Sequence, residues 1–256
     1  LGAHLPSRSP CLRELSAELA RHGITGVTDA GARNGLGEWE CLRAAQASGE
    51  LAQRLFVMGN EELDALASAQ DARIAVGPLK IYLREAALPE LDRLEARVRG
   101  AHAKGRAVAF HCVTRTELVF ALAALRAAGA REGDRIEHAS IADDAAIGEL
   151  AALGVTVVTQ PHFITERGAE YLRDVDRADH ALLYRGASFL RGGVRLAAGS
   201  DAPYGSIDPW CAMRAALSRR TRSGAPLGFA EAVPASQALA LFGGEPTSPG
   251  GGLREL

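Results

Sequence analysis

The segment AVAFHCVTRTELVFALAALRAAGAREGDRIEHAS, residues 107–140, contains the repeating unit that decides the fold. Two apolar segments, 107–112 and 135–139, are typical of buried strands and flank a segment of helical periodicity, 116–128. Gly129 follows this helical segment and is typical of the left-handed residue that ends a helix before a strand. A strand, a helix and a second strand in this order form a parallel unit, so the segment predicts an α/β fold.

The same alternation extends in both directions along the chain. Most of the strand segments are apolar on both faces, as expected when helices cover one face and a barrel core the other. The repeated units favour a TIM-type (β/α)8 barrel over an open doubly wound sheet, although periodicity alone leaves both open. The expected strands are residues 23–30, 53–59, 74–83, 107–112, 135–139, 155–160 and 194–199.

Segments of amphipathic pattern between these strands predict the helices, and several of them end at a glycine. The segment 31–37 lacks the glycine spacing of a phosphate-binding loop and is interpreted as a flexible barrel loop. The expected helices are residues 10–22, 61–70, 89–104, 116–128, 143–153, a longer helical region 169–190, and residues 209–222 and 229–242.

Length and composition suit a single domain. The 256 residues are 47% hydrophobic and 23% charged, which is enough for one α/β barrel with one core. We expect the barrel domain over residues 1–242, incomplete at its N-terminus and lacking its first strand, with a Gly/Pro-rich tail over residues 243–256.

Charge and cysteine content restrict the partners and the compartment. The net charge of −2, with acids and bases interspersed, gives no basic stripe for nucleic acid or for an anionic membrane surface. No apolar run approaches the roughly 20 residues that span a bilayer. The four cysteines form no C-x-x-C pair, which favours free thiols and the cytoplasm. A small-molecule substrate is therefore expected, and the oligomeric state is left open.

Polar residues interrupt the apolar strands at their C-terminal ends. In a barrel this is the edge at which active sites are built. We expect several of these side chains to converge on one point. They are Asp29, Lys80, His111, His138, Gln160, His162 and Asp201.

Lys80 is unusual because only two of the 29 basic residues, Lys and Arg together, are lysine. A lysine kept inside an apolar strand suggests a need for an amine that can lose its proton, which a buried lysine does and an arginine does not. A neutral amine can react with carbon dioxide to give a carbamate, an anionic oxygen ligand able to bridge two metals. The alternative is a lysine that extends its amine to the surface from a strand end.

His111 and His138 also end apolar strands, and neutral imidazole is the commonest metal ligand. Each histidine alone would be interpreted as a hydrogen-bonded core residue, but together with Lys80 and Asp201 they indicate a metal site. The mixture of imidazole and hard oxygen ligands suits Zn²⁺ or a similar ion better than Mg²⁺ or Ca²⁺. Asp201 would take a proton from a metal-bound water, or else would only cap its Ser-Asp-Ala-Pro turn.

The segments HCVTRTEL, GDRIEHAS, GVTVVTQPHF and AAGSDAPYGSIDPW, in this order and spacing, resemble the metal-dependent amidohydrolase superfamily and, within it, the amidohydrolase family 3 branch. The resemblance covers roughly residues 23–241. It implies a barrel with one or two divalent ions, usually zinc, that hydrolyses amide or related C–N bonds in small molecules. By motif, the residues carried over are Lys80 as the bridging carbamylated lysine, His111 and His138 as ligands of the more exposed metal, Asp201 as the general acid/base and metal ligand, and His162 as a residue near the substrate.

The N-terminal region departs from this family pattern. Members begin with a strand that carries an H-x-H pair, whereas His4 is a lone histidine without a strand around it. Seven strands cannot close a barrel that needs eight, so the strands at 23–30 and 194–199 should flank a gap, which either stays open or is filled by some other segment. We expect the gene to continue upstream with a strand ending in H-x-H. The chain as given should bind at most one metal, weakly, with little or no turnover.

The leading hypothesis is a metal-dependent amidohydrolase that cleaves amide or other C–N bonds by a metal-activated hydroxide, with Asp201 as general acid/base. One alternative is a non-catalytic or truncated barrel that binds a ligand without turnover. Another is a phosphate-binding barrel such as an isomerase, for which the SDAPYG turn offers little support. Metal content and stoichiometry would separate the first two hypotheses.

Overall fold

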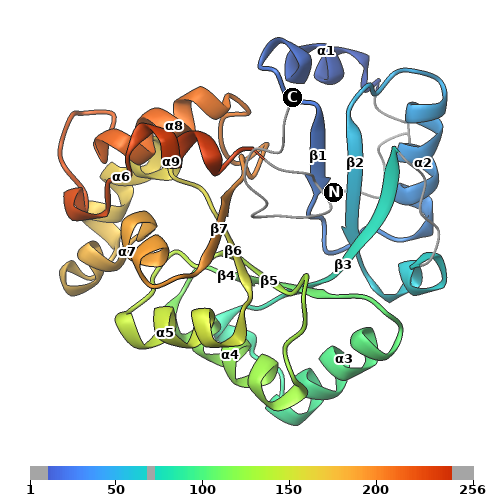
Figure 1. Cartoon of the computed structure of the whole chain (residues 1–256), viewed down its shortest axis with the longest axis horizontal. Coiled ribbons are helices and arrows are strands. Elements are labelled where there is room, and N and C mark those ends of the chain that lie inside the picture. The colour runs from blue at the N-terminus through green and yellow to red at the C-terminus, as the bar shows by residue number, and fades with distance from the viewer. Residues whose placement is uncertain (1–10, 68–72, 244–256) are drawn as a thin grey trace.

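Parallel strands alternate with helices around a curled sheet (Figure 1). In the computed structural model, which describes residues 11–67 and 73–243, each strand pairs with the next one along the chain. Every strand lies within a segment expected from the sequence, so the predicted barrel-type α/β fold is confirmed. The strands are β1 (Gly26–Asp29), β2 (Arg54–Gly59), β3 (Ile74–Tyr82), β4 (Val108–Cys112), β5 (Arg135–His138), β6 (Thr156–Thr159) and β7 (Arg195–Ala198).

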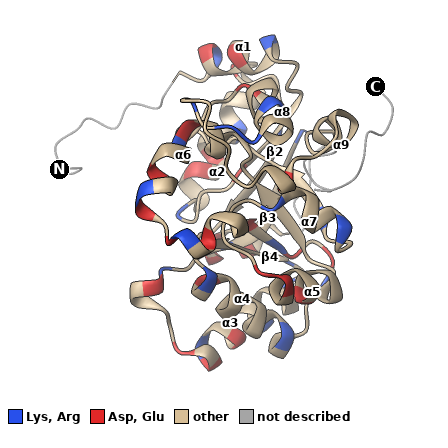
Figure 2. Ribbon diagram, turned by 90° about the vertical axis from the view of Figure 1, so that its left-hand side faces the viewer, with Lys and Arg blue, Asp and Glu red and all other residues tan. Residues whose placement is uncertain are grey.

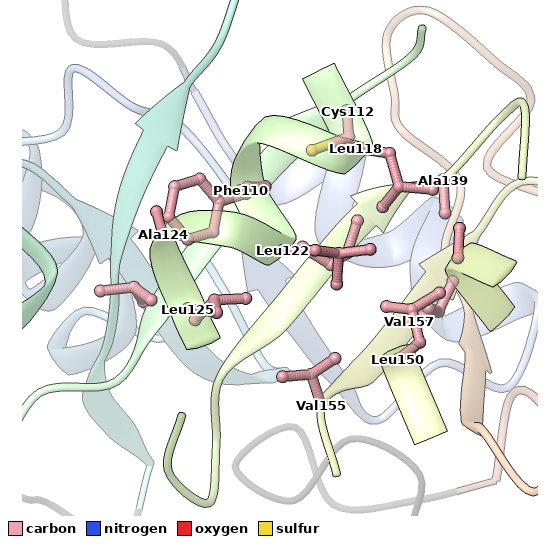
Figure 3. Close-up of a cluster of buried hydrophobic side chains, with 14 of the residues drawn as sticks. Phe110, Cys112, Leu118, Leu122, Ala124, Leu125, Ala139, Leu150, Val155 and Val157 are labelled. Atoms are coloured by element: carbon pink, nitrogen blue, oxygen red, sulfur yellow. The ribbon is translucent and has the colours of Figure 1, made fainter. Parts of the chain in front are cut away.

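The main core lies between the outer face of β3–β7 and the helices that cover it, chiefly α3 (Leu91–Ala103), α4 (Arg115–Ala128) and α5 (Asp144–Leu153). Figure 3 shows Phe110 of β4 and Val157 of β6 packed against leucines of α4 and α5. Burial of each large apolar side chain stabilises the fold by roughly 1.5–3 kcal/mol. Helix α4 begins at a capping box in which Thr114 and Glu117 satisfy each other's backbone amides.

Several helices differ from the sequence-based expectation. The long helical region expected at 169–190 is wrong in its bounds, because α6 (His162–Asp174) starts directly after Pro161, at the end of β6. The remainder forms a 3-10 turn, Arg177–Leu182, and α7 (Gly186–Arg191). The helix expected at 229–242 splits into a 3-10 turn, Phe229–Glu231, and α9 (Ala235–Ala240), since Pro234 favours an extended residue before it.

Near the N-terminus, α1 (Arg13–Arg21) matches its expected segment, but α2 (Leu36–Ala47) was not predicted. The expected helix at 61–70 is a 3-10 turn over Glu61–Leu66, and the end of that segment lies outside the described residues. Helix α8 (Pro209–Ser218) is shorter than its expected segment, 209–222, because Arg219 adopts a left-handed conformation with φ of 50°.

The sheet is open between β1 and β7. These two strands do not pair with each other, and within residues 11–67 and 73–243 no further strand lies between them (Figure 1). The expected gap is therefore confirmed for the described residues. On the β7 side, the backbone amide of Ala198 donates to the carbonyl of Leu241, 2.9 Å away. Apart from Gly243, the tail expected at 243–256 lies outside the described residues.

Charged residues of both signs are spread over the helices in Figure 2. Across the described part of the chain, helices are either too short or too polar to cross a membrane.

Candidate active site

The register of three adjacent strands places Lys80 and His111 on the inner face of the sheet. In the register of the sheet, His111 pairs with Tyr82 on one side and with Glu137 on the other. Lys80, two residues before Tyr82 in β3, pairs with Ala109. Side chains alternate between the two faces of a strand, and the intervening residues of β3 and β4 are buried among the outer helices. Both Lys80 and His111 therefore point away from the helices, into the barrel.

His138 reaches the same region through an unusual backbone conformation. Its partner in the register is Cys112, which belongs to the outer core, so regular alternation would direct His138 outward. His138 and Ala139 instead have positive φ angles of 71° and 45°, a backbone conformation that residues other than glycine rarely adopt. As a result, His138 Nε2 lies 3.0 Å from His111 Nδ1, with the two rings edge to face.

Gln160, at the end of β6, fixes the orientation of His138. Its amide nitrogen donates to the carbonyl of Val158, so its Oε1 accepts from His138 Nδ1 at 2.7 Å. The proton of neutral His138 is then on Nδ1, and the lone pair of Nε2 is directed toward His111. Metal-binding histidines are commonly oriented by such a hydrogen bond on their other nitrogen. The sequence placed Gln160 at a strand end but gave it no role.

Burial keeps both imidazoles neutral. Burial is the largest cause that lowers the pKa of His111 to about 3, and the neighbouring His138 and Lys80 add to the shift. Burial also lowers the pKa of His138, against the opposing effect of the nearby Asp201 and Glu137 carboxylates. Neutral imidazole is the form that binds a metal.

The Lys80 side chain is 5% exposed, and its Nζ lies 3.9 Å from Glu137 Oε1, beyond hydrogen-bond distance. Burial lowers the pKa of Lys80, and the Glu137 carboxylate opposes this shift. Glu137 is itself held by Arg135 through bonds of 2.6 and 3.1 Å. Although burial raises the pKa of Glu137, the charges of Arg135 and Lys80 outweigh it and lower that pKa to about 2.

Sequence reasoning missed this Arg135–Glu137 pair. The signal was present, because two charged residues at alternate positions of an otherwise apolar strand must share one face.

Asp201 follows β7 with a positive φ of 49°. Burial raises the pKa of its carboxyl, while His138 and Lys80 act in the opposite direction. Asp201 lines the same cleft as these two residues. Asp29 of β1 is engaged differently, because its Oδ1 accepts from the Gly31 amide and from Asn34 Nδ2 at 2.9 and 2.8 Å. Of the strand-end residues, the structure thus brings together Lys80, His111, His138, Gln160 and Asp201.

His162 connects the ends of β6 and β7. Its Nε2 donates to the carbonyl of Ser200, 3.0 Å away, so the lone pair of a neutral ring is on Nδ1. His162 is 1% exposed, and Nδ1 has no hydrogen-bond partner among the described residues. Burial lowers the pKa of His162 and keeps the ring neutral. His162 is therefore a buried acceptor whose lone pair is free for a donor.

A cleft of about 2330 Å³ is lined by Lys80, His111, His138, Gln160 and Asp201, and it extends to β1 and to the turn after β7. In the described part of the chain, His, Cys, Asp and Glu side chains do not come together in threes as a metal site. Two neutral imidazoles beside a buried amine can hold one divalent ion if Lys80 supplies an anionic oxygen. With that oxygen, these three residues would supply three ligands to one ion.

The sequence of the chain matches a known protein family. Residues 9–248 match the sequence profile of the amidohydrolase family. The chain belongs to the amidohydrolase family. This match confirms the resemblance to the family 3 branch that the strand-end motifs indicated.

Two curated proteins are similar in sequence to part of this chain. The N-substituted formamide deformylase of Arthrobacter pascens is 35% identical over 109 residues, which is 42% of this amidohydrolase chain and 20% of that protein. YtcJ of Bacillus subtilis, named as an amidohydrolase, is 25% identical over 150 residues, 57% of this chain and 28% of that protein. The chain thus spans less than a third of the length of either relative.

Solved structures show the same fold. A metal-dependent hydrolase from Pyrococcus horikoshii superposes with a TM-score of 0.78 at 21% identity, covering 92% of this chain and 55% of that one. One from Pyrococcus furiosus gives 0.74 at 22% identity, covering 90% and 53%. The zinc complex of atrazine chlorohydrolase TrzN from Arthrobacter aurescens gives 0.59 at 16% identity, covering 91% and 57%.

Proposed function

We propose that this amidohydrolase cleaves an amide or another C–N bond of a small molecule with a divalent metal held by Lys80, His111 and His138. Asp201 acts as the general acid/base. The observation that carries the proposal is the approach of His138 Nε2 to within 3.0 Å of His111 Nδ1, beside the buried amine of Lys80. Burial lowers the pKa of both histidines, so the imidazoles are in the neutral form that binds a metal.

Lys80 fits the role of a carbamylated ligand. Formation of a carbamate needs a neutral amine, and burial lowers the pKa of the Lys80 amine, which favours its neutral form. Zinc suits the resulting mixture of imidazole and oxygen ligands. When bound, the ion would polarise the substrate carbonyl and lower the pKa of water.

The residues of the chain perform the remaining tasks. The partly buried Asp201 has a raised pKa, so it can take a proton from the attacking water and return it to the leaving nitrogen. Gln160 holds His138 in one tautomer, and Arg135 holds the Glu137 carboxylate, which lies 3.9 Å from Lys80 Nζ.

The deformylase relative suggests the first substrates to test, N-substituted formamides and simple N-acyl amines. We expect purified protein supplied with Zn²⁺ and bicarbonate to release the amine slowly. Removal of the metal by a chelator should abolish the release, and Zn²⁺ should restore it. Release of amine at the same rate with and without metal would contradict the proposal.

A second candidate is a barrel that binds ligand and metal without turnover. The observation that favours this candidate is that no three His, Cys, Asp or Glu side chains of the described residues come together to hold a metal ion. Metal binding with no amine release from any amide in the same assay would support this candidate over the hydrolase.

A further inference from the structure

One face of helix α6 borders the cleft, and on this face the arginine Arg167 lies between aromatic side chains. Phe163, Arg167 and Tyr171 recur at every fourth position of the helix, and all three line the cleft. Residues at this spacing lie on the same side of a helix. The helix thus presents one guanidinium to the same cleft into which His111, His138 and Asp201 open.

The Arg167 guanidinium is held in place at two points. Its central carbon lies 4.3 Å from the centre of the Phe163 ring, and its Nη2 donates to the carbonyl of Tyr204 at 2.6 Å. Five N–H groups are available on a guanidinium, so this bond leaves donors unused. The side chain is therefore ordered before any ligand arrives, which reduces the entropy lost on binding.

Arg167 differs from the other arginines that the fold encloses. Arg106, Arg135 and Arg185 each bind a carboxylate, with a nitrogen–oxygen distance of 2.6 Å in every pair. Arg219 donates to four backbone carbonyls instead. Arg167 is half-buried, yet among the described residues it has no carboxylate within salt-bridge distance. A partly desolvated cation without a counter-ion is costly unless an anion completes the site.

The position of Arg167 fits contact with a substrate. Tyr204, whose carbonyl it binds, belongs to the turn that begins at Asp201, and the Tyr204 amide donates to the Asp201 carbonyl at 2.8 Å. The Phe163 ring beneath the guanidinium is 4.8 Å from the ring of His162. The charge of Arg167 also acts to lower the pKa of Asp201. A ligand bound at the strand ends would meet Arg167 on its α6 side.

We propose that Arg167 binds a carboxylate of the substrate, so that the substrate class is an amide with an acidic group near the bond to be cleaved, such as an N-acyl amino acid. A planar carboxylate can accept two parallel bonds from the fork of a guanidinium. This inference rests on the proposed amidohydrolase function and specifies its substrate.

Arg84 is the competing cation in the same cleft. Its guanidinium carbon lies 5.2 Å from the centre of the Tyr82 ring, but its side chain is exposed at the end of β3. An exposed arginine is hydrated and screened by salt, so it should discriminate less between charged and neutral ligands.

The test compares N-acetylglycine with its neutral counterpart N-acetylglycinamide, with binding to the purified chain measured by calorimetry. We expect the carboxylate to bind at least tenfold more tightly in the unmodified protein. Arg167→Gln should remove this preference, and Arg167→Lys should keep part of it. The matched control is Arg173→Gln, which removes the same charge from an exposed position of α6 that is paired with Asp174. It should leave the preference intact, as should Arg84→Gln.

Equal binding of the two probes, or a preference that survives Arg167→Gln, would overturn the inference, and so would a preference lost only in Arg84→Gln. Thermal melting of each variant identifies any that fails to fold, and Arg167→Lys then decides the question. Because binding is measured apart from turnover, a carboxylate preference without amide hydrolysis would contradict the proposed function and leave the carboxylate site standing. Hydrolysis of both probes without preference would contradict only the carboxylate site.

Discussion

At Lys80, His111 and His138, burial is the largest cause of each pKa shift, ahead of any charged neighbour. A buried group avoids the charged form because the low-dielectric interior solvates a charge poorly. In all three residues burial shifts the equilibrium toward the neutral form, which is the form that metal binding or carbamylation requires. Residues of ordinary type thus acquire their chemistry from their position at the strand ends.

Lys80 should be irreplaceable by arginine. Lys80→Ala and Lys80→Arg should both lower the metal content of purified protein to background, because a guanidinium keeps the charge but cannot form a carbamate. Lys104→Arg is the matched control, since Lys104 is exposed and its ion pair with Asp64 can be replaced by arginine. Metal retained in Lys80→Arg would mean that Lys80 contributes only a charge.

Asp201→Asn should separate metal binding from catalysis. The amide side chain keeps the shape of the carboxyl but cannot take a proton, so kcat should fall by about 10² to 10⁴ while most of the metal remains. Steady-state kinetics and elemental analysis on the same preparation measure both quantities. Turnover that is unchanged in this variant would remove Asp201 from the mechanism.

The low pKa of His111 predicts a dependence of metal-free stability on pH. The pKa of this group falls from 6.5 to about 3 on folding, so between these values the unfolded chain binds a proton that the folded chain does not. Stability should therefore fall as the pH falls through this window. We expect the drop in Tm between pH 7 and pH 5 to be smaller in His111→Asn than in the unmodified protein. An equal drop in both proteins would contradict the pKa assigned to His111.

Among the elements, helix α6 illustrates what the sequence pattern could and could not predict. The strands were predicted because β-branched apolar runs between glycines have few alternatives. Helix α6 was expected to begin at residue 169, but it begins at His162, whose polar Nε2 is satisfied by Ser200 of a different segment. Helix α2 was missed because its buried residues include Gln46, which donates to the carbonyls of Gln53 and Arg73.

The turn after β7 should tolerate no side chain at Gly205. A Cβ there would lie 2.3 Å from His162 Nε2 and 2.7 Å from both Phe163 Cε1 and Ser200 O. We expect Gly205→Ala to reduce the free energy of unfolding by about 1–3 kcal/mol, as overpacking commonly does. Gly148→Ala, in α5 with nothing within 4 Å of the added carbon, should instead stabilise by roughly 0.5–1 kcal/mol. Denaturant unfolding measures both, and equal effects of the two substitutions would contradict the packing at Gly205.

In the whole molecule, the curled parallel sheet brings together residues far apart in sequence. Lys80, His111, His138 and Asp201 could be selected from the sequence because the C-terminal ends of parallel barrel strands meet at one edge. The role of Gln160 and the Arg135–Glu137 pair could not be predicted from the sequence, since those contacts depend on strand register and on the positive φ at His138. The position of Arg167 on the cleft could not be predicted either, because the helical region was expected to begin only at residue 169.

The central claim is that the ends of β3, β4 and β5 form one metal site. Elemental analysis of the purified protein, beside His111→Ala and His138→Ala, tests it most directly, with circular dichroism to establish that each variant is folded. We predict at most one divalent ion per chain in the unmodified protein and loss of that ion in both variants. A metal content that is unchanged in both folded variants would contradict the claim.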